Sequence, residues 1–240
     1  MNHNPILEGM PGEPLPYLLH SDWMITTILF LCILLSSLAV SKEKKYLLQR
    51  FKMFFVRRER SSMFDDITAS DFRYNLFLIF HTCLLLGICV YHYYSYHQPE
   101  LFANSSHGWL LGLFTLGICL FLGLKSMLYQ FINWIFYQKE RNSTWMTSFF
   151  NLLIGLGILL LPTVLVIVYF DISSQNSLYT VSFLLILAKI SLFWKCFSNF
   201  FEKIHGALHL ILYFCALEIL PDLILWKGLE LVSNNLILKL

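Results

Sequence analysis

Residues 109–134 read WLLGLFTLGICLFLGLKSMLYQFINW, a run of 26 residues whose one charged side chain is Lys125. About 20 consecutive apolar residues in a helix are enough to cross the hydrocarbon core of a bilayer. This run therefore predicts a membrane-spanning helix. Its apolar character continues to Tyr137, so we expect the helix to tilt in the bilayer or to project from it.

Five further apolar runs of similar length accompany this one. The six predicted spans are 23–41, 74–94, 109–134, 146–170, 178–200 and 206–226. Charged residues make up 13% of the chain, against about 25% in soluble domains. We therefore predict an all-α, polytopic membrane protein, with a bundle of about six transmembrane helices in a single membrane domain over residues 1–240.

Most of the positive charges lie in connections on one side of the predicted spans. Of the 17 Lys and Arg residues, nine lie between Lys42 and Arg73 and none precedes Lys42. Loops on the cytoplasmic side carry an excess of Lys and Arg. We expect a multi-pass protein of the bacterial cytoplasmic (inner) membrane, with residues 1–22 as an external tail, a periplasmic N-terminus and a cytoplasmic basic loop over 42–73.

The basic loop has the pattern of an amphipathic helix lying on the membrane surface. Leu47, Leu48, Phe51, Phe54 and Phe55 share one helical face, and basic residues surround it. Such helices bind anionic lipids, here those of the inner leaflet, and the same face can instead dock a membrane-protein partner. The predicted contact residues are Arg50, Lys52, Arg57, Arg58 and Arg60. No other basic surface lies outside the membrane, so we expect no nucleic-acid partner.

Two opposite charges fall near the middle of the last two predicted spans. Lys189 lies about eleven residues into one span, and Glu218 about twelve residues into the next from the opposite side. Charges in hydrocarbon cost several kcal/mol and therefore need a partner. We predict an intramembrane Lys189–Glu218 pair with Asp222 one turn further on the same face. It acts as a proton or cation site, as a pair that polarises a substrate, or as a structural clamp that fixes helix packing.

Other polar residues lie inside the predicted spans. The ammonium of Lys195 is expected to reach the headgroups along its flexible stem, and Lys125 either does the same or has an intramembrane role. Asn133 and Asn151 are expected to form hydrogen bonds between helices.

The histidines allow a different kind of site. His205 and His209 are four residues apart, Glu202 precedes them by one turn, and His81 lies at a similar depth in another span. Two imidazoles on one helix face can bind a metal ion, and two from different helices can ligate a haem iron. The chain has no second such pair and no haem-attachment motif, so we predict no cofactor and keep the metal or haem protein as an alternative.

The catalytic signatures of common enzyme classes are missing from the sequence. The chain contains no GxSxG, Walker A, HExxH or helix-opening GxGxxG motif. We therefore expect a non-enzymatic membrane component that supports assembly or binds partners in the cell envelope. A small proton-coupled transporter that uses the Lys189–Glu218 pair is the main alternative.

Several polar landmarks give the chain a family resemblance. They are the basic stretch Phe51–Arg60, Arg73–Tyr74, Lys125, Asn133–Trp134, Trp145, Pro162, Lys189 and the segment LHLILYFCALEILP at 208–221. In these residues the chain resembles a family of uncharacterised multi-span inner-membrane proteins of Bacteroidota, known as a domain of unknown function. The resemblance implies a cytoplasmic-membrane location and no catalytic role for any residue.

Overall fold

The computed structural model describes residues 19–37, 41, 69–136, 139–200 and 215–239. The predicted surface helix with Arg50, Lys52, Arg57, Arg58 and Arg60 lies outside these ranges. Glu202, His205 and His209 also lie outside them.

The described residues form helices and no strands, which confirms the predicted all-α class. The long helices are α2 (Ala69–His97), α4 (His107–Phe136), α5 (Lys139–Tyr169), α6 (Ser174–Phe200) and α8 (Leu220–Lys239). The shorter elements are the 3-10 turn η1 (Leu19–Ser21), the helix Trp23–Ser37, α3 (Pro99–Asn104) and the π-helical turn η4 (Cys215–Ile219).

Four helices in the described part of the chain are long and apolar enough to cross a membrane. Their candidate spans are Asn75–His97, His107–Ile135, Asn142–Tyr169 and Ser174–Phe197. Each covers most or all of one predicted span. The helix Trp23–Ser37 is apolar but shorter, at the start of the predicted span 23–41. Lengths and composition thus agree with a multi-pass membrane protein.

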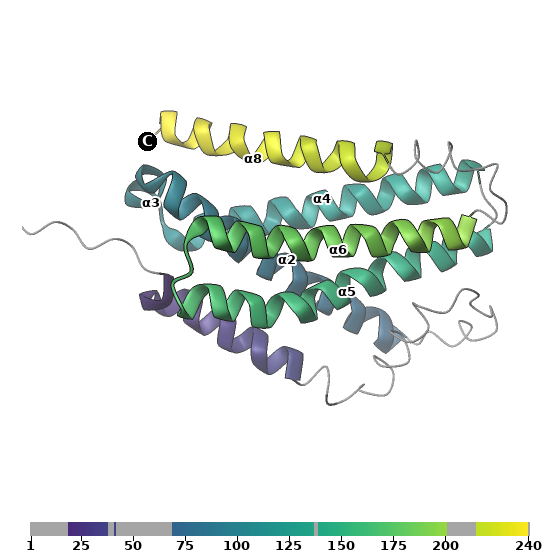
Figure 1. Ribbon diagram of the computed structural model, residues 1–240, viewed down its shortest axis with the longest axis horizontal. Coiled ribbons are helices and arrows are strands. Elements are labelled where there is room, and N and C mark those ends of the chain that lie inside the picture. The colour runs from purple at the N-terminus through teal and green to yellow at the C-terminus, as the bar shows by residue number, and fades with distance from the viewer. Residues whose placement is uncertain (1–18, 38–40, 42–68, 137–138, 201–214, 240) are drawn as a thin grey trace, which may run out of the picture.

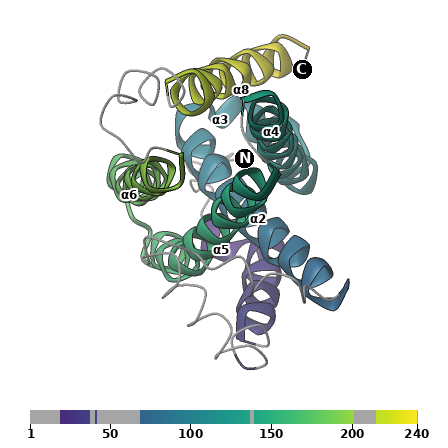
Figure 2. The same cartoon turned by 90° about the vertical axis from the view of Figure 1, so that its right-hand side faces the viewer.

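The long helices lie lengthwise beside one another (Figure 1). The short helix α3, the connection from α5 to α6 and the end of α8 lie at one end of the bundle, while the end of α4 and the start of α5 lie at the other. The end-on view in Figure 2 places α6 and α8 at the periphery. Helices α2 and α5 pack against each other, and each also packs against α4 and α6, so together they form the centre of the bundle.

Two glycines let α2 approach its neighbours closely. A Cβ at Gly87 of α2 would meet Thr115 of α4, and a Cβ at Gly157 of α5 would overlap the hydroxyl of Thr82 on α2. The Thr82 hydroxyl also donates a hydrogen bond to the carbonyl of Leu153 on α5, at 3.2 Å. Small residues at such contacts are typical of helix pairs in membranes, because close packing replaces the hydrophobic drive there.

The last helix differs from its predicted bounds. The sixth predicted span ends at 226, whereas α8 continues to Lys239. The charged residues Lys227 and Glu230 lower the apolar character of this segment, but they form an ion pair at 2.9 Å along the helix. The π-helical turn η4 runs directly into α8, and Pro221, which has no amide N–H to donate, follows this junction. The segment is therefore helical although its sequence is less apolar.

Candidate functional site

Four elements, two of them consecutive in the chain, bring four charged side chains together. Lys125 comes from α4, Lys189 from α6, Glu218 from η4 and Asp222 from the first turn of α8. Glu218 and Asp222 are four residues apart, so both carboxylates leave the same side of the chain. We call these four residues the charge cluster.

Each lysine of the charge cluster is paired with both carboxylates. The Lys125 Nζ lies 2.6 Å from Glu218 Oε2 and 3.3 Å from Asp222 Oδ1. The Lys189 Nζ contacts the same Glu218 Oε2 and lies 2.7 Å from Asp222 Oδ2. The two positive and two negative charges therefore neutralise one another inside the bundle.

Tyr129 completes the surroundings of Glu218. Its hydroxyl donates a hydrogen bond to Glu218 Oε1, the carboxylate oxygen that the lysines do not contact. The ring of Tyr129 packs against Trp145 and Phe149 of α5, with ring centroids 5.4 and 5.3 Å apart. Tyr129 lies one turn after Lys125 on α4, so a single helix face supplies two of the three donors to Glu218.

Two residues of the charge cluster are buried and two are half-buried. The side chains of Lys125 and Glu218 are 4% and 1% exposed, whereas those of Lys189 and Asp222 are 30% and 40% exposed. Lys125 also lies 5.6 Å from the centre of the Phe121 ring, a distance at which a cation is attracted to the ring face. A buried charge without a partner costs several kcal/mol, which is why Glu218 needs its three donors.

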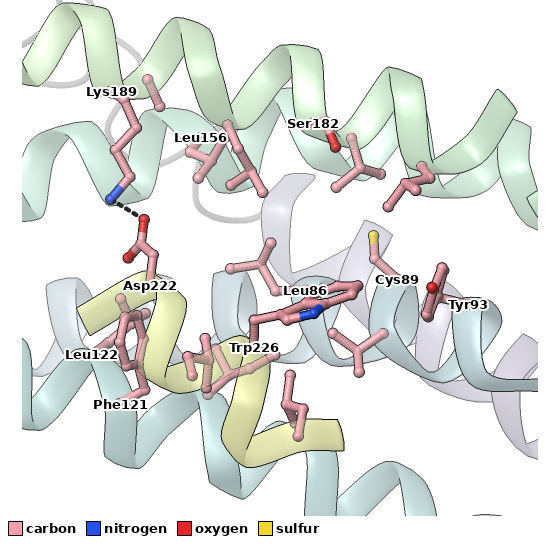
Figure 3. Close-up of a pocket in the computed structure, with 18 of the residues that line it drawn as sticks. Leu86, Cys89, Tyr93, Phe121, Leu122, Leu156, Ser182, Lys189, Asp222 and Trp226 are labelled. Atoms are coloured by element: carbon pink, nitrogen blue, oxygen red, sulfur yellow. Dashed lines mark ion pairs between the residues drawn. The ribbon is translucent and has the colours of Figure 1, made fainter. Parts of the chain in front are cut away.

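A cavity of about 370 Å³ adjoins the charge cluster. Its volume lies within the range of small-molecule sites in proteins. The cavity lies between α6 and α8, and α2, α4 and α5 supply the rest of its mostly apolar wall. Figure 3 shows Lys189 of α6 and Asp222 of α8 facing each other at one end, with Trp226, Leu86 and Tyr93 among the lining side chains further along.

The other end of the cavity is lined by His92, Ser174 and Ser177. The Ser177 hydroxyl donates to the carbonyl of Ile172 at 3.2 Å, so its oxygen is left to accept a hydrogen bond from His92 Nε2 at 3.1 Å. In a neutral imidazole with Nε2 protonated, Nδ1 is a hydrogen-bond acceptor. Neither His92 Nδ1 nor the Ser174 hydroxyl has a partner among the described residues.

The structure brings together Lys189, Glu218 and Asp222, as the sequence predicts, and adds two residues. From the sequence, Lys125 is expected either to reach the headgroups or to have an intramembrane role. The structure places it in the charge cluster, since its side chain is buried and paired. Tyr129 is missed altogether, although its position one turn from Lys125 is a usable signal. The interpretation of Lys195 is wrong, because this side chain is buried instead of reaching outward.

The remaining predicted polar residues lie elsewhere in the bundle. Asn133 of α4 is buried and donates to Asn142 of α5 at 3.2 Å, so it bonds between helices. Asn151 is half-buried on α5. His81 is buried on α2, and its Nε2 lies 3.0 Å from the hydroxyl of Ser36. The described ranges hold no group of three His, Cys, Asp or Glu side chains placed to bind a metal ion.

Comparison with known proteins places the chain in a family. No curated protein and no solved structure matches it. The family model described as a domain of unknown function, DUF4271, matches residues 25–229, a range that includes the whole charge cluster. This match confirms the resemblance to a domain of unknown function. The chain therefore belongs to the DUF4271 family.

Proposed function

We propose that the protein is a non-enzymatic component of the cell envelope, which supports assembly or binds partner proteins within the membrane. The observation that supports this proposal is the pairing within the charge cluster. Each lysine contacts both carboxylates, and the Tyr129 hydroxyl donates to the remaining oxygen of Glu218. A general base or nucleophile needs a reactive atom that is free to reach a substrate. A neutral, paired cluster fits a clamp that holds η4 and α8 against α4 and α6.

The proposed location is the cytoplasmic membrane of a bacterium, with the N-terminus in the periplasm. The support is the distribution of Lys and Arg, because nine of the 17 lie between Lys42 and Arg73. The end of the bundle with α3 and the C-terminus then faces the periplasm (Figure 1). The basic residues Arg50, Lys52, Arg57, Arg58 and Arg60 then contact anionic lipids of the inner leaflet.

The proposed partner surface is the outward face of α6. In the most apolar stretch of α6 only 11% of the residues are buried, against 50% in α2 and α5. An uncovered apolar helix face inside a membrane contacts either lipid or another helix. Ile186 and Ile190 lie on this face and do not line the cavity, which makes them suitable for testing it.

Co-purification tests this function. The tagged full chain is extracted from native membranes in mild detergent, and bound proteins are quantified by mass spectrometry. We expect a stoichiometric membrane-protein partner that is lost from an Ile186→Ala/Ile190→Ala variant. The matched control is Leu116→Ala/Leu120→Ala on α4, because these leucines are 57% and 60% exposed and the two isoleucines are 58% and 60% exposed.

Two results would contradict the proposal. A wild-type chain that purifies without any stoichiometric partner rejects the interaction role itself. A partner that survives the α6 variant but not the α4 control rejects only α6 as the docking surface.

Proton-coupled transport is a second candidate, and one observation favours it. The cavity reaches the charge cluster, and the half-buried side chains of Lys189 and Asp222 line it together with the buried Glu218. A carboxylate that exchanges protons with a cavity can couple their movement to a substrate. In proteoliposomes with a pH gradient, a transporter takes up protons, and a Glu218→Gln variant that folds normally does not. A variant that fails to fold points to the clamp instead.

A further inference from the structure

The cavity between α6 and α8 is long and almost entirely apolar. Ser174 and Lys189 both line it, and they are fifteen residues apart on one helix, which corresponds to about 22 Å. One leaflet of the hydrocarbon core is about 15 Å thick. The cavity is therefore long enough for one acyl chain that runs from the headgroup region to the middle of the bilayer.

The cavity can be reached from the surrounding lipid. Leu178 of α6 and Trp226 of α8 line it and are also exposed on the surface of the bundle. In Figure 3 the indole of Trp226 lies along the cavity, beyond the ion pair of Lys189 and Asp222. A membrane lipid can therefore enter sideways between these two helices without first leaving the bilayer.

The polar groups at the two ends of the cavity differ in whether they already have partners. At the end formed by the charge cluster, the charges are already paired with one another. At the opposite end of the cavity His92 is buried, yet its Nδ1 has no partner among the described residues. The hydroxyl of Ser174 has none there either. Buried polar atoms are nearly always hydrogen-bonded, to protein, water or ligand. An acceptor nitrogen at His92 fits any partner that carries an N–H or O–H donor, a lipid head group among them.

We propose that this cavity binds one phospholipid, whose acyl chain lies between α6 and α8 and whose head group donates a hydrogen bond to His92 Nδ1. The Ser174 hydroxyl binds the same head group. Phosphatidylethanolamine supplies an ammonium donor and phosphatidylglycerol supplies hydroxyl donors, whereas phosphatidylcholine has neither. This binding site is independent of the partner surface proposed on α6.

Lipid retention by the purified full chain tests the proposal. The protein is incubated in detergent with equal amounts of the three phospholipids, and native mass spectrometry counts those that remain bound. We expect one lipid per chain, with the ethanolamine or glycerol lipid retained about 3- to 10-fold better than the choline lipid, which corresponds to the loss of one hydrogen bond. Which of the two is preferred identifies the donor.

Two pairs of variants separate the acyl site from the head-group site. Ser182→Trp fills the cavity and should abolish retention, whereas Ser191→Trp lies on the same helix outside the cavity and should not. If Ser182→Trp does not fold, Leu185→Phe replaces it, because Leu185 also lines the cavity. His92→Phe keeps a ring of similar size and should remove the preference for donor-bearing lipids while leaving a bound lipid.

Three outcomes would overturn the proposal. The first is a wild-type chain that retains no lipid. The second is equal retention by Ser182→Trp and Ser191→Trp, which places the lipid on the outer surface of the bundle. The third is retention of phosphatidylcholine as strong as that of the other two lipids, which leaves His92 Nδ1 without a role in recognition.

Discussion

Replacing Glu218 by Gln should destabilise the protein strongly, because it removes one of the two carboxylates that share two lysines. Lys125 is 4% exposed, so its charge cannot be compensated by water. Its other ion-pair partner is Asp222, at 3.3 Å, and Asp222 also pairs with Lys189. Breaking a buried ion pair by removing one partner costs about 3–5 kcal/mol, and we expect the Gln variant to lose stability in that range.

The measurement is the free energy of unfolding of the detergent-solubilised protein, from SDS titration followed by circular dichroism. A second variant isolates the electrostatic cause: Glu218→Gln with Lys125→Met restores neutrality, and we expect it to recover most of the lost stability. A loss below about 1 kcal/mol for the single variant, the size expected of an exposed pair, would refute the clamp. A double variant no more stable than Glu218→Gln would refute the charge argument.

Two further predictions concern the packing around the site. Gly157→Ala should cost about 1–3 kcal/mol of unfolding free energy, because the added Cβ overlaps Thr82, whereas Gly117→Ala has open space and should be neutral or stabilising in the same titration. Tyr129→Phe should cost about 1.5–3 kcal/mol through the lost hydrogen bond to Glu218. That loss should disappear in a Glu218→Leu background, where no acceptor for the hydroxyl remains, if the hydrogen bond is its cause, and full additivity of the two changes would contradict it.

The helices follow from the sequence because each is a long apolar run. The four span-forming helices cover most or all of the corresponding predictions and extend beyond some of them, since polar residues near the membrane surface remain helical. Two features are missed for a physical reason. Helix α8 continues through Lys227 and Glu230, which pair with each other along the helix, and α3 is a six-residue helix that begins at Pro99. Neither of these helical segments is a long apolar run, so hydropathy does not predict it.

The charge cluster is only partly predictable. The depths of Lys189 and Glu218 in their spans indicate that they can meet, because depth along a helix is a one-dimensional quantity. That Lys125 joins them depends on which helices are neighbours, and hydropathy contains no information about this. The long stem of a lysine allows two environments at the same depth, so its position alone does not distinguish headgroup contact from burial. The cavity is likewise a result of packing and has no signature in the sequence.

The charge cluster also imposes an order on the making of this protein. A ribosome synthesises Lys125 and Lys189 before Glu218 and Asp222, so two ammonium groups enter the membrane before either of their carboxylates exists. Insertion of each costs about 2.5–3.5 kcal/mol at the centre of a helix. A nascent chain that stops short of Glu218 keeps both unpaired charges in the bilayer. Synthesis of Glu218 and Asp222 is thus the step that supplies the charge cluster with its negative charges and makes it electrically neutral.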